Sequence, residues 1–234
     1  MVACGSHKKP ISIARNSSVQ KPQSQPHNGP KLTKIENIEQ LRKYYRPAQE
    51  RALAKQLSRL ELHSRRFIEL SPFIAISSCG ADGRMDVSPR GEKPGFVHVL
   101  DETTIAIPDR PGNNRLDTLE NLVSNSAIGL IFMVPGINEV MRLNGVAEIR
   151  TDEFLLEKFR VNNRPPATVI LVQVEEVYMH CAKAITRSRL WDIAAQVERS
   201  VLPTMSEIIR NQIGSDISFE SQVEMERRHK KQLY

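Results

Sequence analysis

Several features are scarce in this sequence of 234 residues, and each scarcity excludes a class of protein. The three cysteines, Cys4, Cys79 and Cys181, are odd in number and lack CxxC spacing, which argues against both a disulfide framework and a zinc site. No apolar run approaches the length needed to cross a membrane. Aromatic residues make up only 5% of the chain, which is few for a surface that stacks single-stranded nucleic acid. We therefore expect a protein of a reducing, cytoplasmic compartment that binds neither a membrane nor nucleic acid.

Acidic residues are absent from the first 35 positions, which carry six Lys and Arg residues. The rest of the chain contains 27 bases and 27 acids and is therefore neutral. The net charge of +6 and the isoelectric point near 9.3 thus arise from the start of the chain. A domain that binds nucleic acid would instead need a clustered basic face.

Apolar patterning is also missing from residues 1–32. This stretch contains Pro10, Pro22, Pro26 and Pro30 among many Ser, Asn and Gln residues. Such a segment cannot offset its ordering entropy by burial, so we predict a disordered basic tail. Residues 33–234 then form one folded domain with helices at its start and a helical extension at its end. The alternative of a mitochondrial targeting peptide stays open for the tail, although its amphipathic pattern is poor.

Several catalytic motifs are absent from the whole sequence. There is no GxGxxG after a strand, no P-loop, no HExxH and no GxSxG nucleophile elbow. Predicted strands also outnumber the helices between them, which disfavours a doubly wound Rossmann sheet. The fold class that remains is mainly β, an antiparallel barrel of about six strands with peripheral helices packed around its ends.

The spacing of apolar residues predicts where the individual strands and helices lie. Alternating or continuous apolar runs predict strands over residues 73–78, 85–88, 127–134, 140–150 and 167–178, with a hairpin over residues 96–107. Helical spacing predicts helices over residues 33–47, 48–62 and 151–160, one that Arg115 opens, and one capped by the Thr204-x-x-Glu207 box. In the helix after Arg115, the stripe expected to be buried is Leu116, Leu119 and Val123.

Two polar loops, SPRGEKPG and PDRPGNNR, flank the central hairpin and carry many hydrogen-bond donors. Arg forks and backbone N–H groups next to Gly recognise phosphate oxygens, and a helix N-terminus also favours an anion. The alternative is that these are solvated, salt-bridged loop residues. The candidate ligands of an organic phosphate in these loops are Ser88, Arg90, Lys93, Pro108, Arg110, Asn113, Asn114 and Arg115.

A resemblance supports the phosphate interpretation. The motifs SPF, DVSPRG, IPDRPGNNR, RLNGVAEI and HCAKAITRSRLWD occur in an order that resembles the pyridoxamine 5'-phosphate oxidase-like flavoproteins, in particular their uncharacterised FMN-binding branch. The likeness extends from about Ile35 to the end of the chain. It implies a split β-barrel that binds FMN near the interface of a homodimer, with the phosphate held by basic and hydroxyl residues of the two loops.

Three further residues are candidates for the flavin itself. Arg142 meets the pyrimidine edge of the ring if its side chain points into the barrel mouth, and is a cross-strand charge partner if it points outward. Lys183 and Trp191 fall where the resembled family approaches its cofactor or substrate, and a Trp face or a Lys suits a flavin ring. The alternative for Trp191 is that it closes the core.

The expected function is that of an FMN-dependent oxidoreductase acting on a small organic substrate or on NAD(P)H. The sequence shows no catalytic acid–base pair and no metal site, in line with chemistry that the cofactor carries. One alternative is a flavin- or haem-binding protein without turnover, with His98 and His180 as the candidate haem ligands; relatives also use a deazaflavin. A true pyridoxamine 5'-phosphate oxidase is a weaker alternative, because the substrate-gripping motif of that enzyme is not recognisable after Trp191.

Overall fold

A computed structural model describes residues 33–214 and 221–232 of the chain. It divides the chain into two units, Met1–Pro47 and Ala48–Tyr234. In the first unit the structure describes one short helix, α1 (Ile38–Arg42), none of whose residues is buried. The second unit contains the sheet and the core. The disordered tail predicted for residues 1–32 lies outside the described residues.

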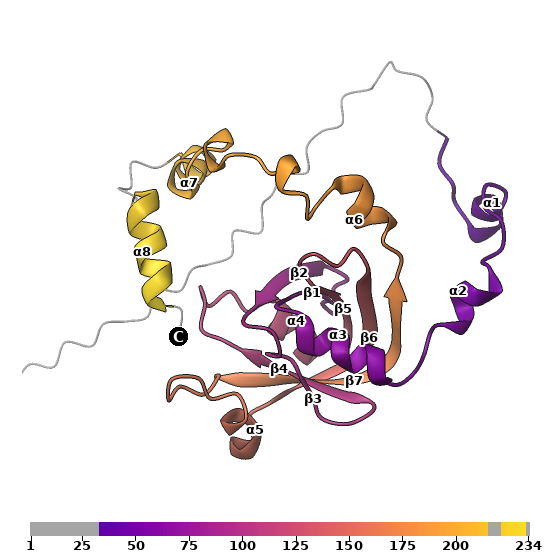
Figure 1. The fold of residues 1–234 in the computed structure, drawn as a ribbon, viewed down its shortest axis with the longest axis horizontal. Helices are drawn as coiled ribbons and strands as arrows, with labels where there is room; N and C mark the ends of the chain where they lie inside the picture. The colour runs from indigo at the N-terminus through magenta and orange to yellow at the C-terminus, as the bar shows by residue number, and fades with distance from the viewer. Residues whose placement is uncertain (1–32, 215–220, 233–234) are drawn as a thin grey trace, which may run out of the picture. The chain divides into compact units, whose positions relative to one another are not determined.

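The helices and strands of the second unit alternate in short stretches along the chain (Figure 1). They are α2 (Glu50–Ala54), α3 (Leu62–Leu70), β1 (Phe73–Cys79), β2 (Met85–Gly91), β3 (His98–Val99), β4 (Thr104–Asp109), α4 (Asp117–Ser124), β5 (Ala127–Met133), β6 (Val140–Arg150), α5 (Glu153–Glu157), β7 (Thr168–His180), α6 (Lys183–Ser188), two 3₁₀ turns (Ile193–Ala195 and Arg199–Val201), α7 (Met205–Ile213) and α8 (Gln222–Gln232).

The strands form one antiparallel sheet of seven strands in the order β2-β1-β5-β6-β7-β4-β3. The sheet curls into a split barrel, seen nearly end-on in Figure 1. The fold is therefore the antiparallel split β-barrel with peripheral helices that the sequence predicted. Strand β2 is one edge of the sheet and β3 is the other.

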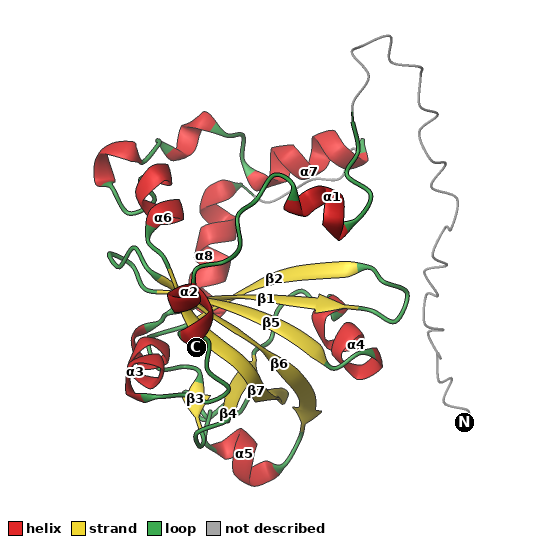
Figure 2. Cartoon of the chain, turned by 90° about the vertical axis from the view of Figure 1, so that its right-hand side faces the viewer, coloured by secondary structure: helices red, strands yellow, loops and turns green. Residues whose placement is uncertain are grey.

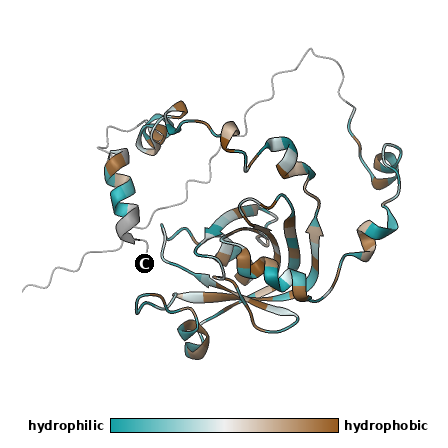
Figure 3. Ribbon diagram, in the orientation of Figure 1, coloured by the Kyte–Doolittle hydropathy of each residue, from teal (hydrophilic) through white to brown (hydrophobic). Residues whose placement is uncertain are grey.

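Alternation of side chains explains how the curled sheet encloses a core. In β1, Ile74 and Ile76 are fully buried, and in β6, Met141 and Leu143 are fully buried, while their neighbours face outward. Hydrophobic residues accordingly concentrate in the strands and in α3 (Figure 3). Because one face of every strand packs inward, slipping the register by one residue would expose this core.

Two helices close the ends of the barrel. Helix α3 contributes Phe67 and Ile68 to the core, and α4 contributes Leu119 and Leu122. Figure 2 shows these helices at opposite ends of the strands. Their apolar faces thus seal the core where the strands leave it open.

The longest strand pair, β6 with β7, has a bulge between Asn144 and Gly145. A Cβ atom at Gly145 would collide with the backbone carbonyl oxygen of Gln173. Only glycine allows this approach of the two backbones, so the bulge that bends β6 depends on it.

Most strand predictions are confirmed, but β2 is longer than expected. It runs to Gly91 and pairs with β1 along its length, so Ser88 and Arg90 belong to a strand and not to a loop. Pro89 is tolerated there because β2 is an edge strand whose outer side needs no N–H donor.

Several predicted helices are longer than the helices observed. The expected helix over residues 33–47 shrinks to α1, which Asn37 caps in place of Thr33. The expected helix over residues 48–62 breaks after α2, because Leu57 forms a bridge with Val177 of β7. The helix expected over residues 151–160 is only α5.

In α4 the buried stripe differs from the predicted one. Thr118, Leu119 and Leu122 are buried, whereas Leu116 and Val123 are exposed. Helix α4 begins at Asp117, so Leu116 is its N-cap and does not share the helical periodicity. The capping box at Thr204 and Glu207, in contrast, is confirmed as the start of α7. Among the described helices, none has the length and apolar character required to cross a membrane.

The cap of α3 gives a first prediction. The Glu61 carboxylate accepts hydrogen bonds from the backbone N–H groups of His63 (2.8 Å) and Ser64 (2.7 Å). Burial raises the pKa of Glu61, but these hydrogen bonds outweigh it and hold the pKa below its ordinary value of 4.5. Glu61→Ala should therefore lower the free energy of unfolding by about 1 kcal/mol at pH 7, as measured by urea unfolding.

The pH dependence of this loss follows from the lowered pKa. The stabilisation is fully present above pH 4.5 and disappears as the pH falls through the lower folded pKa, so the two proteins should converge in acid. Glu69→Ala, which removes an exposed carboxylate from the same helix, is the control and should have a smaller effect. A loss that persists unchanged at low pH would contradict the capping role.

Candidate functional site

Two ion pairs join the edge strand β2 to β4, which lies next to the opposite edge of the sheet. The Arg90 guanidinium lies 3.3 Å from the Asp109 carboxylate, and Arg110 Nε lies 2.7 Å from Glu92 Oε1. We call these four residues the clasp. Their positions make it a reciprocal link, since each segment supplies one Arg and one acid. The clasp therefore joins β2 to β4 through side chains, because the two strands are not neighbours in the hydrogen-bonded order of the sheet.

Burial makes the clasp stronger than an ordinary surface pair. The side chains of Arg110 and Glu92 are each only 13% exposed. Arg110 also donates from Nη1 to the carbonyl oxygen of Phe159 at 2.8 Å, which adds the segment after α5 to the link. Charge-assisted hydrogen bonds with little solvent around them contribute more than exposed ones.

The second pair of the clasp is electrostatically strained. Burial raises the pKa of Asp109 above its ordinary value of 3.8, although the charge of Arg90 acts in the opposite direction. In addition, Arg90 Nε is buried without a hydrogen-bond partner among the described residues. Arg90 thus has an unused donor beside the carboxylate with which it pairs.

Strand β2 and the segment between β4 and α4 carry most of the residues predicted to bind a phosphate. The elements on either side of this segment contact β2: Asp109 of β4 pairs with Arg90, and Thr118 Oγ1 of α4 donates to Asp86 at 2.5 Å. Ser88 lies between Asp86 and Arg90 on the same face of β2. Its hydroxyl has no hydrogen-bond partner within the described part of the chain. We call this strip, together with residues 110–117, the donor groove.

The segment between β4 and α4 carries Asn113, Asn114 and Arg115. Asn113 Oδ1 accepts from the Arg115 N–H at 3.0 Å, and Asn114 adopts a left-handed conformation with φ of 58°. The Arg115 side chain is 76% exposed and its Nε lies 2.9 Å from Asp117 Oδ2. The prediction that Arg115 opens the helix is wrong by two residues, because Asp117 is the first helical residue.

The other predicted site residues lie at different places on the barrel. Pro108 is buried within β4, opposite Val169, and Lys93 is exposed in the loop after β2. Arg142 points outward from β6 and lies over the ring of its cross-strand partner Tyr178, 5.3 Å from the centroid. Of the two orientations considered for Arg142, the outward one is observed.

Lys183 and Trp191 lie in the segment after β7. Lys183 is the first residue of α6, and the half-buried Trp191 donates from Nε1 to the carbonyl oxygen of Ile137 at 2.8 Å. This bond fastens the segment to the loop between β5 and β6. Trp191 is thus held by the barrel of its own chain and does not belong to the donor groove.

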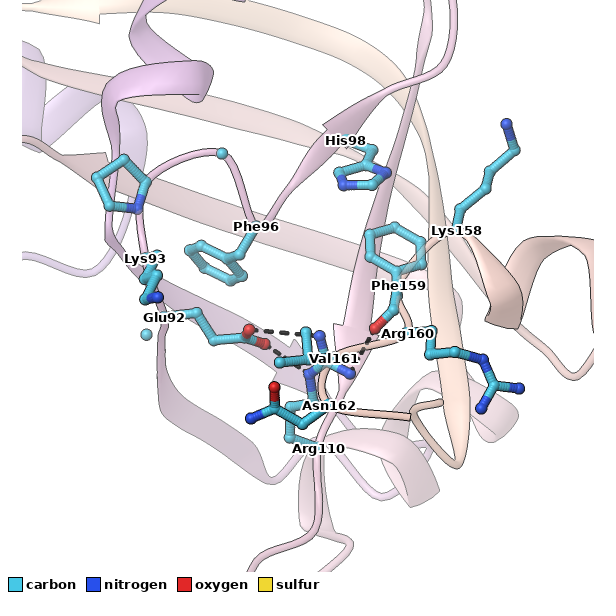
Figure 4. A pocket seen from close by; sticks show the side chains of 13 residues that line it. Glu92, Lys93, Phe96, His98, Arg110, Lys158, Phe159, Arg160, Val161 and Asn162 are labelled. Atoms are coloured by element: carbon cyan, nitrogen blue, oxygen red, sulfur yellow. Dashed lines mark hydrogen bonds and ion pairs between the residues drawn. The ribbon is translucent and has the colours of Figure 1, made fainter. Parts of the chain in front are cut away.

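A cavity of about 510 Å³ opens on the other side of the Arg110–Glu92 pair (Figure 4). We call it the ring cavity, because Phe96, His98 and Phe159 line it. Sequence patterns did not single out Phe159, Lys158 or Asn162 as site residues. They follow α5, about 60 residues from the loop after β2, and only the fold brings them beside it.

A second hollow, of about 550 Å³, lies on the outer face of the sheet. Strands β1, β2, β5 and β6 line it with the outward side chains Val87, Ile131 and Arg142, and His180 lies at its border. Two of these are large exposed apolar side chains, Val87 at 69% and Ile131 at 39%. Within residues 33–214 and 221–232, no group of three or more His, Cys, Asp or Glu side chains is placed to hold a metal ion.

The architecture described above is that of a split-barrel protein. A family model described as pyridoxamine 5'-phosphate oxidase matches residues 60–181, which is just over half of the chain. The chain therefore belongs to the pyridoxamine 5'-phosphate oxidase family, which includes flavin-binding oxidoreductases.

Solved structures of similar fold include HupZ from Group A Streptococcus, with 17% identity, a TM-score of 0.43, and coverage of 51% of this chain and 93% of that chain. A putative pyridoxamine 5'-phosphate oxidase from Lactobacillus delbrueckii has 21% identity and a TM-score of 0.42, over 53% of this chain and 98% of that one. An F420 reductase has 15% identity and a TM-score of 0.35, over 50% and 94%. Similarity at this level does not extend to function. A comparison with curated proteins finds no match.

The clasp gives a second prediction. Glu92→Ala leaves the largely buried Arg110 guanidinium without its carboxylate, so the free energy of unfolding should fall by roughly 2–3 kcal/mol in a urea titration. Glu102→Ala removes one partner of the exposed pair Arg59–Glu102 and is the control, expected to leave stability unchanged within error. Equal effects of the two substitutions would show that the Arg110–Glu92 pair does not hold the barrel closed.

Proposed function

We propose that this protein is an FMN-binding flavoprotein and that it acts as an oxidoreductase. The observation that carries the proposal is the buried Nε of Arg90, which has no hydrogen-bond partner among the described residues and lies on the same face of β2 as the Ser88 hydroxyl. Buried or half-buried donors without acceptors are uncommon, because an unsatisfied buried donor costs about 1–3 kcal/mol. A phosphate monoester supplies the missing acceptors.

The chemistry of the donor groove fits the phosphate of FMN. Ser88 offers a hydroxyl and Arg90 a charged N–H, both from β2. Asn113, Asn114 and Arg115 offer amides and a guanidinium from the opposite side, next to the N-terminal end of α4. A phosphate here would also accept a charge-assisted hydrogen bond from the Nε of Arg90. The groove therefore discriminates a phosphorylated flavin from an unphosphorylated one.

A bound flavin would supply hydride and electron transfer between a small organic substrate, or NAD(P)H, and its ring system. The residues of this chain would bind the phosphate, orient the ring and exclude water from one of its faces. None of them needs to be an acid or base catalyst, which agrees with the absence of an evident catalytic pair in the sequence.

The proposal includes a homodimer. The outer face of β2 and β5 exposes Met85, Val87 and Ile131 around the outer hollow, and Arg142 borders it. Exposed apolar faces of this kind are typical of subunit interfaces, and a second copy of the chain is the partner that the family resemblance implies. A reducing, cytoplasmic environment agrees with the free thiols of Cys79 and Cys181.

Binding of FMN and riboflavin to two variants tests the phosphate assignment. Arg115→Ala should weaken FMN binding about 10- to 30-fold and leave riboflavin binding nearly unchanged, because only FMN has the charge that Arg115 recognises. The matched control is Arg84→Ala, since Arg84 is also an exposed Arg paired with an Asp two residues away. It should change neither affinity. Equal losses for FMN and riboflavin would place the effect in folding or ring packing and contradict the phosphate site.

The class of cofactor is tested by the absorbance spectrum of the purified protein together with the mass of the released ligand. Flavin bands and the mass of FMN are expected. A Soret band instead would identify a haem protein, with His180 at the border of the outer hollow as the ligand to substitute first. A protein that neither carries nor takes up a flavin when FMN is added would contradict the proposal.

The homodimer is tested by light scattering on a variant of the outer face. Val87→Asp places a charge at the centre of the exposed apolar surface and should turn a dimer into a monomer, while Val123→Asp, at an equally exposed valine on α4, should not. A stable monomer of the unmodified protein at micromolar concentration would exclude the dimer.

A further inference from the structure

The ring cavity is not explained by flavin binding at the donor groove. It shares one wall with the clasp, but its lining comes from the loop Gly91–Gly95, from β3, and from residues 158–162 after α5. None of Ser88, Asn113, Asn114 or Arg115 borders it. Its volume, about 510 Å³, lies within the range of small-molecule sites in proteins.

The floor of the ring cavity is flat, apolar and rigid. The rings of His98 and Phe159 stack with their centroids 4.1 Å apart and an angle of 28° between their planes. Phe159 is 3% exposed and packs in a core with Leu155 and Val169, and Phe96 is 8% exposed. Planar side chains fixed in this way favour stacking with a planar ligand, because they lose little conformational entropy on binding.

The mouth of the ring cavity is positive. Lys93 and Lys158 are exposed at it, and neither has an ion-pair partner in the described part of the chain. Glu92 is the acid among the lining residues, and Arg110 already neutralises it. Figure 4 shows Lys93 and Lys158 on opposite sides of the cavity. An anion in the cavity meets the ammonium of Lys93, and the flexible side chain of Lys158, drawn directed away from the cavity in Figure 4, can turn a second ammonium toward it, with no uncompensated negative charge among the lining residues.

His98 joins the floor as a neutral ring. Burial, followed by the charges of Lys158 and Arg110, lowers the pKa of His98 below its ordinary value of 6.5, and Glu92 acts weakly in the opposite direction. The imidazole is therefore uncharged at neutral pH. It can stack on a ligand ring, and its titration reports any new charge placed next to it.

From the stacked floor and the two free lysines we infer that the ring cavity is a second binding site, for a small planar aromatic anion, a ring bearing a carboxylate or a phosphate. The ring lies against His98, Phe96 and Phe159, and the anionic group lies between Lys93 and Lys158. The site is separate from the donor groove and does not require the flavin.

Three probes separate the contributions of ring and charge in solution. They are 2-naphthoate, its neutral analogue 2-naphthamide, and acetate, which has the charge without the ring. Binding to the purified full-length protein is followed through the imidazole NMR signals of His98. The naphthoate should bind at least tenfold more tightly than either of the others, and its carboxylate should raise the pH at which His98 titrates. Equal affinity of naphthoate and naphthamide, or of naphthoate and acetate, would overturn the inference.

Lysine variants locate the charge. Lys93→Ala with Lys158→Ala should weaken naphthoate about tenfold and leave naphthamide unchanged. Both side chains are exposed, so the double variant folds. Lys34→Ala with Lys43→Ala removes the same net charge from residues that do not line the cavity and should have no effect. Equal losses of naphthoate affinity in the two double variants would show that only the net charge of the protein matters. That result would contradict the site.

The two proposed sites are distinguished by competition. Naphthoate should bind in the presence of saturating FMN, and Arg115→Ala should leave its affinity unchanged. Displacement of naphthoate by one equivalent of FMN would make the ring cavity part of the flavin site and overturn the second site. An unmodified protein that binds naphthoate but does not bind FMN would instead contradict the proposed cofactor and leave the ring cavity standing.

Discussion

The ion pairs between β2 and β4 are the constraint on which the rest of this structure depends. An open sheet of seven strands has two edges, and here the edge at β2 is joined to β4 by Arg90–Asp109 and Arg110–Glu92. The pairs hold the curled sheet around its core and fix the loops on both sides of them. The donor groove and the ring cavity therefore both adjoin these two ion pairs.

The clasp also explains why polar loops are so charged in an otherwise neutral body. An Arg that closes a barrel needs an acid in place, since an unpaired buried guanidinium is costly. The pairing is incomplete at one point, where Arg90 Nε has no acceptor among the described residues and the pKa of Asp109 is raised by burial. A structural pair with an unused donor is well suited to share that donor with a ligand phosphate. In the proposed function, closure of the barrel and recognition of the phosphate would use the same residue.

Of the two interpretations of the charged loops, salt-bridged residues are observed for Arg90, Arg110 and Arg115, and the phosphate interpretation stays a prediction. Arg110 is committed to Glu92 and to the Phe159 carbonyl, as the salt-bridged alternative expects. Ser88, Asn113 and Asn114 remain on the donor groove. Spacing along the chain could not separate these roles, because Glu92 and Arg110 are 18 positions apart and meet only when the barrel closes.

Local pattern by itself determined the strands, because a period of two and the turn residues between runs depend only on near neighbours. It also determined the cap of α7 at Thr204, whose partners lie within one turn. The tertiary structure decided where β2 ends, since pairing with β1 extends it over Pro89 to Gly91. It decided that α4 begins at Asp117, and that Phe159 and Lys158 meet the loop after β2. These outcomes depend on contacts between segments that are far apart in the sequence. A short stretch of sequence includes only one side of each contact and therefore does not predict its free energy.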